Sequence, residues 1–387
     1  MTLLTVSFFL ATVYAAVLFF YLKGWRACPE WRIPEGFEPD IQVSVIIPAR
    51  NEAANIGACL QAIAAGSYPP GLLEIIVVDD FSDDDTAETV LQWREGQNSP
   101  VVRLIRLSDL SPAGAGKKKA LETGIAAATG TLIVTTDADC VAPEDWLRWV
   151  VSRFHPVTPD GNSEVGLLIA PVAFHREQNL LQRFQSLDFL GLMGITGAGI
   201  QTGFQRMGNG ANLAFPKAVF EEVGGYSGNE NLASGDDMFL IRKIALRYPE
   251  GIFFLKNAAA TVLTEARPDL RSFFQQRLRW GTKNAAFPEW PVRLVLLAVF
   301  LFCWSILINS VLAIAGQVQA QAALLFQLGI KAFADYIFLR EMCRYFKRED
   351  LLRWFVPSFF LHTLYIPLVG VASLFLKKYK WKGRRVR

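Results

Sequence analysis

The stretch Thr131-Leu-Ile-Val-Thr-Thr-Asp137-Ala-Asp139-Cys140 carries two carboxylates at the end of a short apolar run. The run is rich in β-branched residues and is bounded by Gly130 and Pro143, which predicts a buried β-strand. Ligands of α/β sheets bind beyond the carboxyl ends of the strands. Because alternate residues of a strand point to opposite faces, we expect Asp137 and Asp139 to share a face.

Two interpretations of this D-x-D pattern are open when it stands alone. Its hard oxygen ligands suit Mg²⁺ or Mn²⁺ held together with a diphosphate. A solvated, Asp-rich turn at the end of a strand is the commoner alternative. The neighbouring motifs therefore decide which interpretation holds.

Strands and helices alternate through the preceding part of the chain. Strands are expected at residues 43–48, 74–80, 101–107 and 131–136, and helices at residues 86–95 and 120–128. A further helix follows the first strand, with Asn51 as its expected N-cap and its end near Gly66. This alternation with short connections predicts a mainly parallel, doubly wound α/β sheet with helices on both faces.

Polar residues gather at the carboxyl edge of this predicted sheet. Asp79 and Asp80 end the second strand, and a Gly- and Lys-rich loop at residues 111–119 precedes a helix. A diphosphate needs cations, and a base and ribose need acceptors, so the combination predicts a nucleotide site. The lysine run alone would more often be a solvated helix start. The chain lacks G-x-x-x-x-G-K-[ST], which disfavours a P-loop ATPase.

Four segments of this half form a recognisable series. They are Val45-Ile-Ile-Pro-Ala-Arg-Asn-Glu52, Val77-Val-Asp-Asp-Phe-Ser-Asp-Asp-Asp-Thr86, Gly116-Lys-Lys-Lys-Ala-Leu121 and Thr136-Asp-Ala-Asp139. Together they resemble the nucleotide-binding half of glycosyltransferase family 2. The resemblance implies a GT-A fold, an inverting transfer from a nucleotide-diphosphate sugar and a divalent cation, Mg²⁺ or Mn²⁺. Phe81 stands where glycine is usual and Glu122 where asparagine often occurs, so these loops depart from the pattern.

The same resemblance implies roles for individual residues. Those expected to bind the nucleotide part of the donor are Glu52, Asp79 or Asp80, and Lys117. Asp139 is the expected metal ligand, and Asp137 is expected to contact the ribose or the metal.

An acid pair opens a later helix at Asp236 and Asp237. Carboxylates are favourable at the positive N-terminal end of a helix, so a simple cap is one interpretation. An inverting transferase also needs a carboxylate that takes the proton from the acceptor hydroxyl. In the family the second acid of such a pair has this role, so Asp237 is the candidate base and Asp236 its neighbour.

Two segments upstream of the acid pair have less specific patterns. Residues 179–195 predict a helix rich in Leu and Phe that lines an acceptor site, touches the bilayer or belongs to the core. Glycines from Gly191 to Gly199 are expected to make its end mobile. Residues 208–216 resemble the family's small-residue segment that precedes the acceptor site.

A Q-x-x-R-W motif follows at Gln276, Arg279 and Trp280. Their spacing of three and four places all three on one face of a helix. There Arg279 can stabilise the departing diphosphate and Trp280 can stack on a sugar ring. The alternative is an interfacial helix with a snorkelling arginine. The motif resembles that of cellulose, hyaluronan and poly-N-acetylglucosamine synthases and, with variation, of ceramide glucosyltransferase-like enzymes.

The chain also predicts membrane segments, since 52% of its residues are hydrophobic and only 19% are charged. Residues 3–22 are uncharged and long enough to cross a bilayer. A signal peptide would have a basic segment before its apolar stretch, and no such segment precedes residue 3, so we expect an anchor. Further apolar runs lie at residues 292–315, 320–339 and 354–376. Lys331 and Asp335 interrupt the second of these, where they can pair on one helix face.

Positive charges follow the first apolar run and occupy residues 340–353 and 377–387. The positive-inside rule places all three groups in the cytoplasm, which requires the run at 354–376 to be re-entrant, interfacial or kinked at Pro367. The expected organisation is an anchor (1–24), a linker (25–40), a cytoplasmic GT-A domain (41–270), an interfacial helix (271–290) and a membrane region with a basic tail (291–387).

These features predict a multi-pass inner-membrane enzyme that moves a sugar from a nucleotide-diphosphate sugar, expected to be a UDP-sugar, to a polysaccharide or lipid-linked acceptor. Transfer of a single sugar to a lipid or polyprenyl acceptor is the alternative. A transporter or scaffold with a nucleotide-sensing domain is disfavoured, because the metal site, the base and the diphosphate-binding arginine occur together. The net charge of +3 gives no indication of nucleic acid. The scattered cysteines and histidines indicate neither a zinc site nor a disulfide framework.

Overall fold

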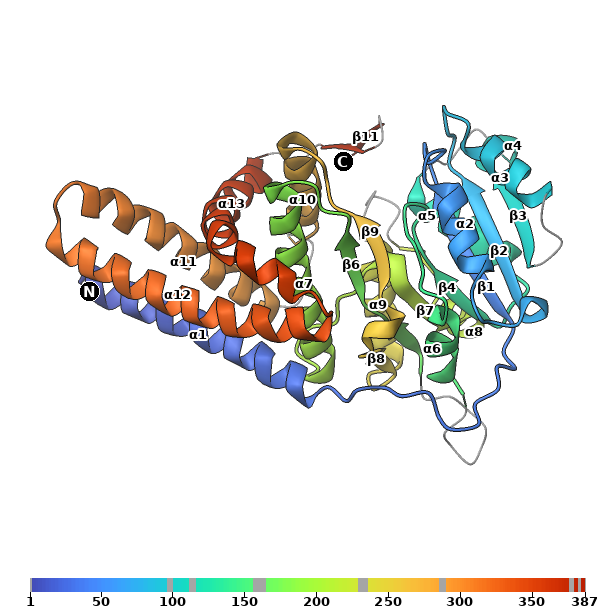
Figure 1. The fold of residues 1–387 in the computed structure, drawn as a ribbon, viewed down its shortest axis with the longest axis horizontal. Helices are drawn as coiled ribbons and strands as arrows, with labels where there is room; N and C mark the ends of the chain where they lie inside the picture. The colour runs from blue at the N-terminus through green and yellow to red at the C-terminus, as the bar shows by residue number, and fades with distance from the viewer. Residues whose placement is uncertain are drawn as a thin grey trace.

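A computed structural model describes residues 2–95, 100–110, 116–155, 165–228, 236–284, 290–375, 379–381 and 384–386. Its main element is a seven-stranded sheet of order β3-β2-β1-β4-β7-β5-β8. The strands are β1 (Val43–Ala49), β2 (Leu73–Asp79), β3 (Val101–Arg106), β4 (Leu132–Thr135), β5 (Leu167–Ile169), β7 (Leu213–Pro216) and β8 (Ile252–Phe254). The expected mainly parallel α/β sheet is confirmed (Figure 1).

The central strands β1, β2 and β4 are parallel, so their carboxyl ends lie at one edge. Ala49 pairs with Asp79, and Ile46 pairs with Thr135 at the end of β4. All seven residues of β2 are buried, as expected for a strand covered on both faces. Only β7 runs antiparallel to its neighbours β4 and β5. This register brings the segments that follow β1, β2 and β4 to one place.

Several helices cover the seven-stranded sheet. Those of the sheet are α2 (Ile56–Ala64), α3 (Thr86–Glu95), α4 (Leu107–Leu110), α5 (Lys117–Ala127), α6 (Trp146–Ser152), α8 (Lys217–Glu222) and α9 (Asp236–Arg247). A second, two-stranded sheet pairs β6 (Val172–His175) with β9 (Val262–Glu265). The strand β6 is followed by α7 (Leu180–Gln201), and β9 is followed by α10 (Leu270–Asn284). These two helices lie between the seven-stranded sheet and the apolar helices (Figure 1).

Asn51 is not the cap of the first helix, contrary to expectation. The helix α2 begins at Ile56, and Asn51 adopts a left-handed backbone with φ 52°. Its Oδ1 accepts a hydrogen bond of 2.8 Å from the backbone N–H of Asp83. Asn51 therefore connects the loops after β1 and β2 instead of starting a helix.

Among the residues that the structure describes, four helices are long and apolar enough to cross a membrane. They are α1 (Leu3–Ala27), α11 (Trp290–Ile314), α12 (Val318–Tyr345) and α13 (Phe355–Phe375), the last entered through a 3₁₀ turn at Glu349–Trp354. The helices α1, α11 and α12 lie side by side as a bundle (Figure 1). By contrast, α13 packs mainly on α7, α10 and α11, close to the sheet domain.

Small residues of α7 let the two halves of the molecule approach closely. A Cβ atom at Gly194 would lie 2.1 Å from the sulfur of Met342 in α12, so a larger residue there would require Met342 to move. Gly191, Gly197 and Gly199 also lie within α7. The helix continues past these glycines to Gln201, and the glycines lie close to neighbouring residues.

Polar contacts also connect the sheet domain with the apolar helices. The Lys256 ammonium donates to the carbonyl oxygens of Trp25 (2.7 Å) and Cys28 (2.9 Å) at the end of α1. Arg348, which follows α12, forms an ion pair of 2.9 Å with Glu177 just before α7. The sheet domain is thus fixed to the apolar helices at two separate points.

Candidate active site

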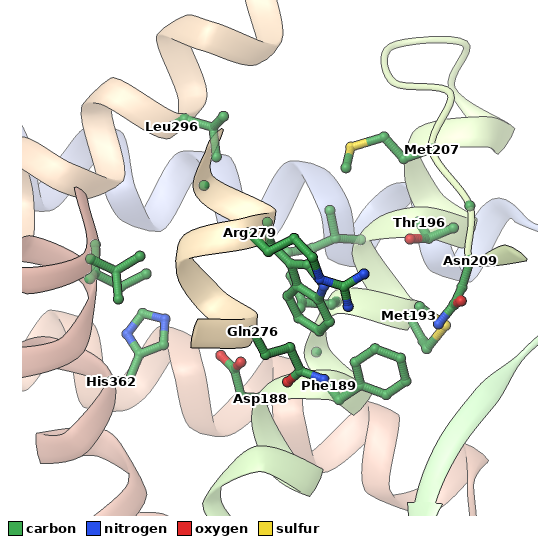
Figure 2. A pocket seen from close by; sticks show the side chains of 18 of the residues that line it. Asp188, Phe189, Met193, Thr196, Met207, Asn209, Gln276, Arg279, Leu296 and His362 are labelled. Carbon is green, nitrogen blue, oxygen red and sulfur yellow. The ribbon is translucent and has the colours of Figure 1, made fainter. Parts of the chain in front are cut away.

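A cavity of about 910 Å³ begins at the carboxyl edge of β4 and continues between α7, α10 and the apolar helices (Figure 2). The predicted residues that line its polar end are Lys117, Asp137, Asp139, Asp237, Gln276, Arg279 and Trp280. Its other end is lined by apolar side chains of α1, α11, α12 and α13, including Val17, Leu296, Phe338 and Phe359. One cavity therefore connects the predicted reaction site with the membrane helices.

The two carboxylates of the D-x-D motif lie on a turn and not on the strand. The strand β4 ends at Thr135, and the backbone N–H of Cys140 donates to the carbonyl oxygen of Asp137 (3.1 Å). The expectation that strand alternation places Asp137 and Asp139 on one face is therefore wrong. The turn nevertheless brings both to the cavity.

Lys117 lies opposite this turn as the first residue of α5. It follows Gly116, whose φ of 130° favours glycine, and its ammonium forms an ion pair with Asp137 Oδ1. Burial acts to lower the pKa of Lys117, but Asp137 and Asp237 outweigh burial, so the pKa is raised above its ordinary value. Lys117 thus remains a cation among carboxylates.

Asp237 reaches the same place from the first turn of α9, where its Oδ1 accepts from the backbone N–H of Met238 (2.9 Å). A Cβ atom at Gly210 would lie 3.7 Å from Lys117 Nζ and 4.0 Å from Asp237 Oδ2. Thr135 Oγ1 donates to the Gly210 carbonyl (2.7 Å) and holds this segment against β4. Asp236 begins α9, but its side chain lies outside the described residues.

The helix α10 presents its Q-x-x-R-W residues to the cavity, as their spacing predicts. Gln276, Arg279 and Trp280 all line it, and Phe189 of α7 packs 6.1 Å from Trp280 between ring centroids. The intervening Arg277 is 3% exposed and forms a buried ion pair with Asp188 at 2.7 Å. Its guanidinium lies 4.3 Å from the Trp280 ring, so it orients that side chain.

Models of two families match the chain. One, described as glycosyl transferase family 2, matches residues 44–161, and another, described as glycosyl transferase family group 2, matches residues 132–371, more than half of the chain. The chain belongs to glycosyltransferase family 2.

Several curated glycosyltransferases are similar to the chain. Probable glycosyltransferase YdaM of Bacillus subtilis is 28% identical over 269 residues, which are 68% of this chain and 60% of that protein. Beta-monoglucosyldiacylglycerol synthase of Synechocystis is 35% identical over 116 residues, which are 30% of this chain and 23% of that enzyme. The matches thus span less than two thirds of these relatives.

A solved structure is similar over nearly the whole chain. Mannosyltransferase PcManGT from Pyrobaculum calidifontis, in complex with GDP-Man and Mn²⁺, has a TM-score of 0.60 at 21% sequence identity. The similarity covers 97% of this chain and 100% of that one. It shows that this glycosyltransferase has the expected GT-A fold.

The residues expected at the nucleoside lie beside the cavity. Glu52, Asp79 and Asp80 are buried, and none of them is among the described residues that line it. Asp80 Oδ1 accepts from the backbone N–H of Gly116 (2.9 Å), which ties β2 to the Lys117 loop. Burial raises the pKa of Asp79. Their nucleoside role remains a prediction.

The departure at Phe81 has a structural explanation. Phe81 has φ 55°, a left-handed conformation that favours glycine. Arg50 donates to the carbonyl oxygens of Asp80 and Phe81 and so holds this turn in place. The loop therefore keeps a conformation that suits glycine although a phenylalanine occupies it.

The carboxylates fit a divalent cation bound together with its substrate. Among the described residues no group of three or more His, Cys, Asp or Glu is arranged to hold a metal alone. Mg²⁺ is commonly bound by one or two carboxylates, with phosphate and water oxygens completing its coordination. Asp137 pairs with Lys117, and Asp139 as the metal ligand remains a prediction.

Several residues of the cavity were not expected from the sequence. His362, Tyr365 and Asp188 line it, although the spacing of the three histidines gave no reason to select His362. The sequence contained one indication that Asp188 is functional, since it is an acidic residue inside the Leu- and Phe-rich run at 179–195. The expected pair of Lys331 and Asp335 is present at 2.5 Å, and Asp335 reaches the cavity.

Proposed function

We propose that this glycosyltransferase transfers a sugar from a nucleotide-diphosphate sugar to a hydroxyl of a lipid acceptor. The observation that carries this proposal is the cavity that joins Asp139 and Asp237 to the side chains of the membrane helices. A lipid can enter such a cavity from the bilayer with its tail among apolar residues. The names of similar proteins give further support, since they include a diacylglycerol glycolipid synthase and an undecaprenyl-phosphate transferase.

In the proposed reaction Asp237 takes the proton of the acceptor hydroxyl while that oxygen attacks the anomeric carbon. The bond from this carbon to the diphosphate breaks, and the configuration is inverted. Arg279 stabilises the departing diphosphate by charge-assisted hydrogen bonds, and Trp280 offers its ring to a sugar. A cation on Asp139 would neutralise diphosphate charge. Lys117 holds Asp137 in place beside this site.

Polymer synthesis is the second candidate, because the Q-x-x-R-W residues lie at the site and a poly-beta-1,6-N-acetyl-D-glucosamine synthase of Staphylococcus epidermidis is 23% identical over 183 residues. A growing glycan needs a path lined by polar groups and aromatic rings. The cavity beyond Trp280 is lined mainly by apolar side chains of the membrane helices, with few polar groups to replace the hydration of a glycan, which favours a lipid.

A tryptophan in the apolar part of the cavity should block the acceptor. Leu296 of α11 lines the cavity and is 40% exposed, whereas Leu301 of the same helix is 43% exposed and is not among the lining residues. We expect Leu296→Trp to lower transfer of radiolabelled sugar into extracted lipid about tenfold, the effect of losing roughly 1.4 kcal/mol of acceptor binding. Donor hydrolysis without acceptor should be unchanged.

The matched control is Leu301→Trp, which adds the same ring to the same helix. It should retain the transfer rate of the unchanged enzyme. Equal transfer by both variants at equal membrane levels would contradict entry of the acceptor through this cavity.

The proposal also includes an orientation with the catalytic domain and the basic tail in the cytoplasm. It is supported by the positive charges after α1 and by α13, which packs on α7 and α10 near the sheet domain. We expect a single cysteine placed after residue 380 to be protected from a membrane-impermeant maleimide in intact cells. Labelling without lysis would place the tail outside and contradict this orientation.

A further inference from the structure

Buried polar atoms without a hydrogen-bond partner collect in one part of the cavity. Within the described part of the chain there are eleven such side-chain atoms, and two of them, Asp188 Oδ2 and Arg277 Nη2, face each other in an ion pair of 2.7 Å. Four others belong to residues of α10 and α13 around one region, namely Gln276 Oε1, Arg277 Nε, Ser358 Oγ and His362 Nδ1. Since more than about 90% of buried polar groups are paired in proteins, this concentration indicates atoms that bind something beyond the chain.

These atoms are directed towards a shared space. Asp188, Gln276, Ser358 and His362 all line the cavity. Ser358 is 4% exposed and lies one helical turn before His362, so the two share a face of α13. In the view of Figure 2, Asp188 lies between His362 and Gln276. We call Asp188, Gln276, Ser358 and His362 the headgroup subsite.

The scaffold of the subsite is rigid. Tyr365 of α13 donates its hydroxyl hydrogen to Asp188 Oδ1 (3.1 Å), and Arg277 lies 2.7 Å from Asp188 Oδ2. This contact links α7, α10 and α13 through one buried carboxylate. Ser358 and His362 are therefore held at fixed positions relative to Gln276.

The charges around the subsite are already balanced. Arg277 pairs with Asp188, and Lys331 pairs with Asp335. The described basic residues that line the whole cavity are Lys117, Arg267, Arg279 and Arg293. The acidic ones are Asp137, Asp139, Asp188, Asp237, Glu265 and Asp335, and of these Asp188 and Asp335 are neutralised by Arg277 and Lys331. The two ion pairs beside the subsite carry no net charge, so they do not attract a phosphate, and this favours an uncharged acceptor.

We propose that the headgroup subsite binds an uncharged lipid headgroup that carries hydroxyl or ester groups. This inference rests on the proposed function and specifies the class of its acceptor. The hydrocarbon chains lie against apolar neighbours such as Leu296 and Phe359, and one hydroxyl points towards Asp237. Ser358 and His362 exchange hydrogen bonds with the remaining oxygens of the headgroup.

Acceptor choice tests this proposal. The purified full-length protein is given a radiolabelled UDP-sugar and detergent micelles that contain either dioleoylglycerol or undecaprenyl phosphate. Transfer to dioleoylglycerol at least about tenfold faster than to undecaprenyl phosphate is the expected result. Preferred transfer to undecaprenyl phosphate would overturn the uncharged headgroup and leave the lipid-acceptor function standing. Label found only in water-soluble polymer would overturn both.

Variants of His362 test the subsite itself. We expect His362→Leu, which is close in size but cannot form hydrogen bonds, to raise the KM for dioleoylglycerol about tenfold. His362→Asn, whose amide can replace Nδ1, should recover most of this affinity. The KM for the UDP-sugar should not change in either variant.

A purely structural role for His362 would give a different result. It would lower the unfolding temperature and affect both substrates alike, or leave both KM values unchanged, and either outcome would overturn the proposal. If His362→Leu does not fold, Ser358→Ala removes one hydroxyl from the same helix face and should raise the acceptor KM alone. An unchanged acceptor KM in Ser358→Ala would then contradict the subsite.

Discussion

Asp237→Asn should lower the rate of sugar transfer by about 10²- to 10⁴-fold, the usual contribution of a general base. The amide keeps the size of the side chain and its contact with the backbone N–H of Met238, but it cannot accept a proton from the acceptor hydroxyl. Nucleotide binding should be nearly unchanged, since the replaced group belongs to the acceptor side of the reaction. Initial rates and UDP titration of the same preparation measure the two effects separately.

Glu221→Gln is the matched control for this variant. Glu221 is an exposed residue of α8 that forms an ion pair of 4.0 Å with Lys217. The same change from acid to amide should therefore leave transfer unaffected. A transfer rate of Asp237→Asn within about threefold of the unchanged enzyme would remove Asp237 from the mechanism.

Asp139→Asn is expected to have the second largest effect, through the divalent cation. The loss of one negative ligand should raise the Mn²⁺ concentration for half-maximal activity by about 100-fold or more, since changes even in outer-shell partners of metal ligands cost about 10- to 100-fold. Excess Mn²⁺ should recover part of the rate. Activity measured against the Mn²⁺ concentration after removal of metal with a chelator checks both expectations.

Asp145→Asn provides the control for the metal variant. Asp145 lies in the same segment outside the cavity lining, and its carboxylate accepts from Ser67, a contact that an amide oxygen can replace. Its Mn²⁺ dependence should match that of the unchanged enzyme. An unaltered Mn²⁺ dependence in Asp139→Asn would contradict the assignment of this residue.

The sheet could be predicted from the sequence because local patterns determine it. Apolar β-branched runs such as Val43–Ala49 and Leu73–Asp79 alternate with helices, and short connections leave few topologies open. The faces of the helices followed from spacing for the same reason, so Gln276, Arg279 and Trp280 point into the cavity together. Periodicity within one element was sufficient for both.

The backbone conformation of the loops was harder to predict from the sequence, because several side chains compete for the same backbone groups. Asn51 has the residue type of an N-cap, but its amide oxygen accepts from Asp83 and α2 begins at Ile56. The strand β4 stops at Thr135, and a turn carries the two aspartates beyond it. Asp137 and Asp139 were thus identified as cavity residues, but the expected reason, alternation along a strand, does not hold.

The membrane side of the site depends on contacts between distant segments. Asp188, Gln276 and His362 meet only because α7, α10 and α13 pack on one another, and no spacing in the sequence encodes this packing. Single polar residues in apolar runs were the only local sign of it. They indicate that a polar site exists and leave its partners undetermined.

The distribution of product between lipid and polymer tests the central claim most directly. Membranes that contain the enzyme are incubated with radiolabelled nucleotide sugars and then extracted with chloroform and methanol, with membranes of Asp237→Asn as the blank. The lipid-acceptor proposal predicts that the Asp237-dependent label enters the organic phase as a discrete glycolipid. Label that instead stays with insoluble or high-molecular-mass glycan, with none in the organic phase, would contradict it.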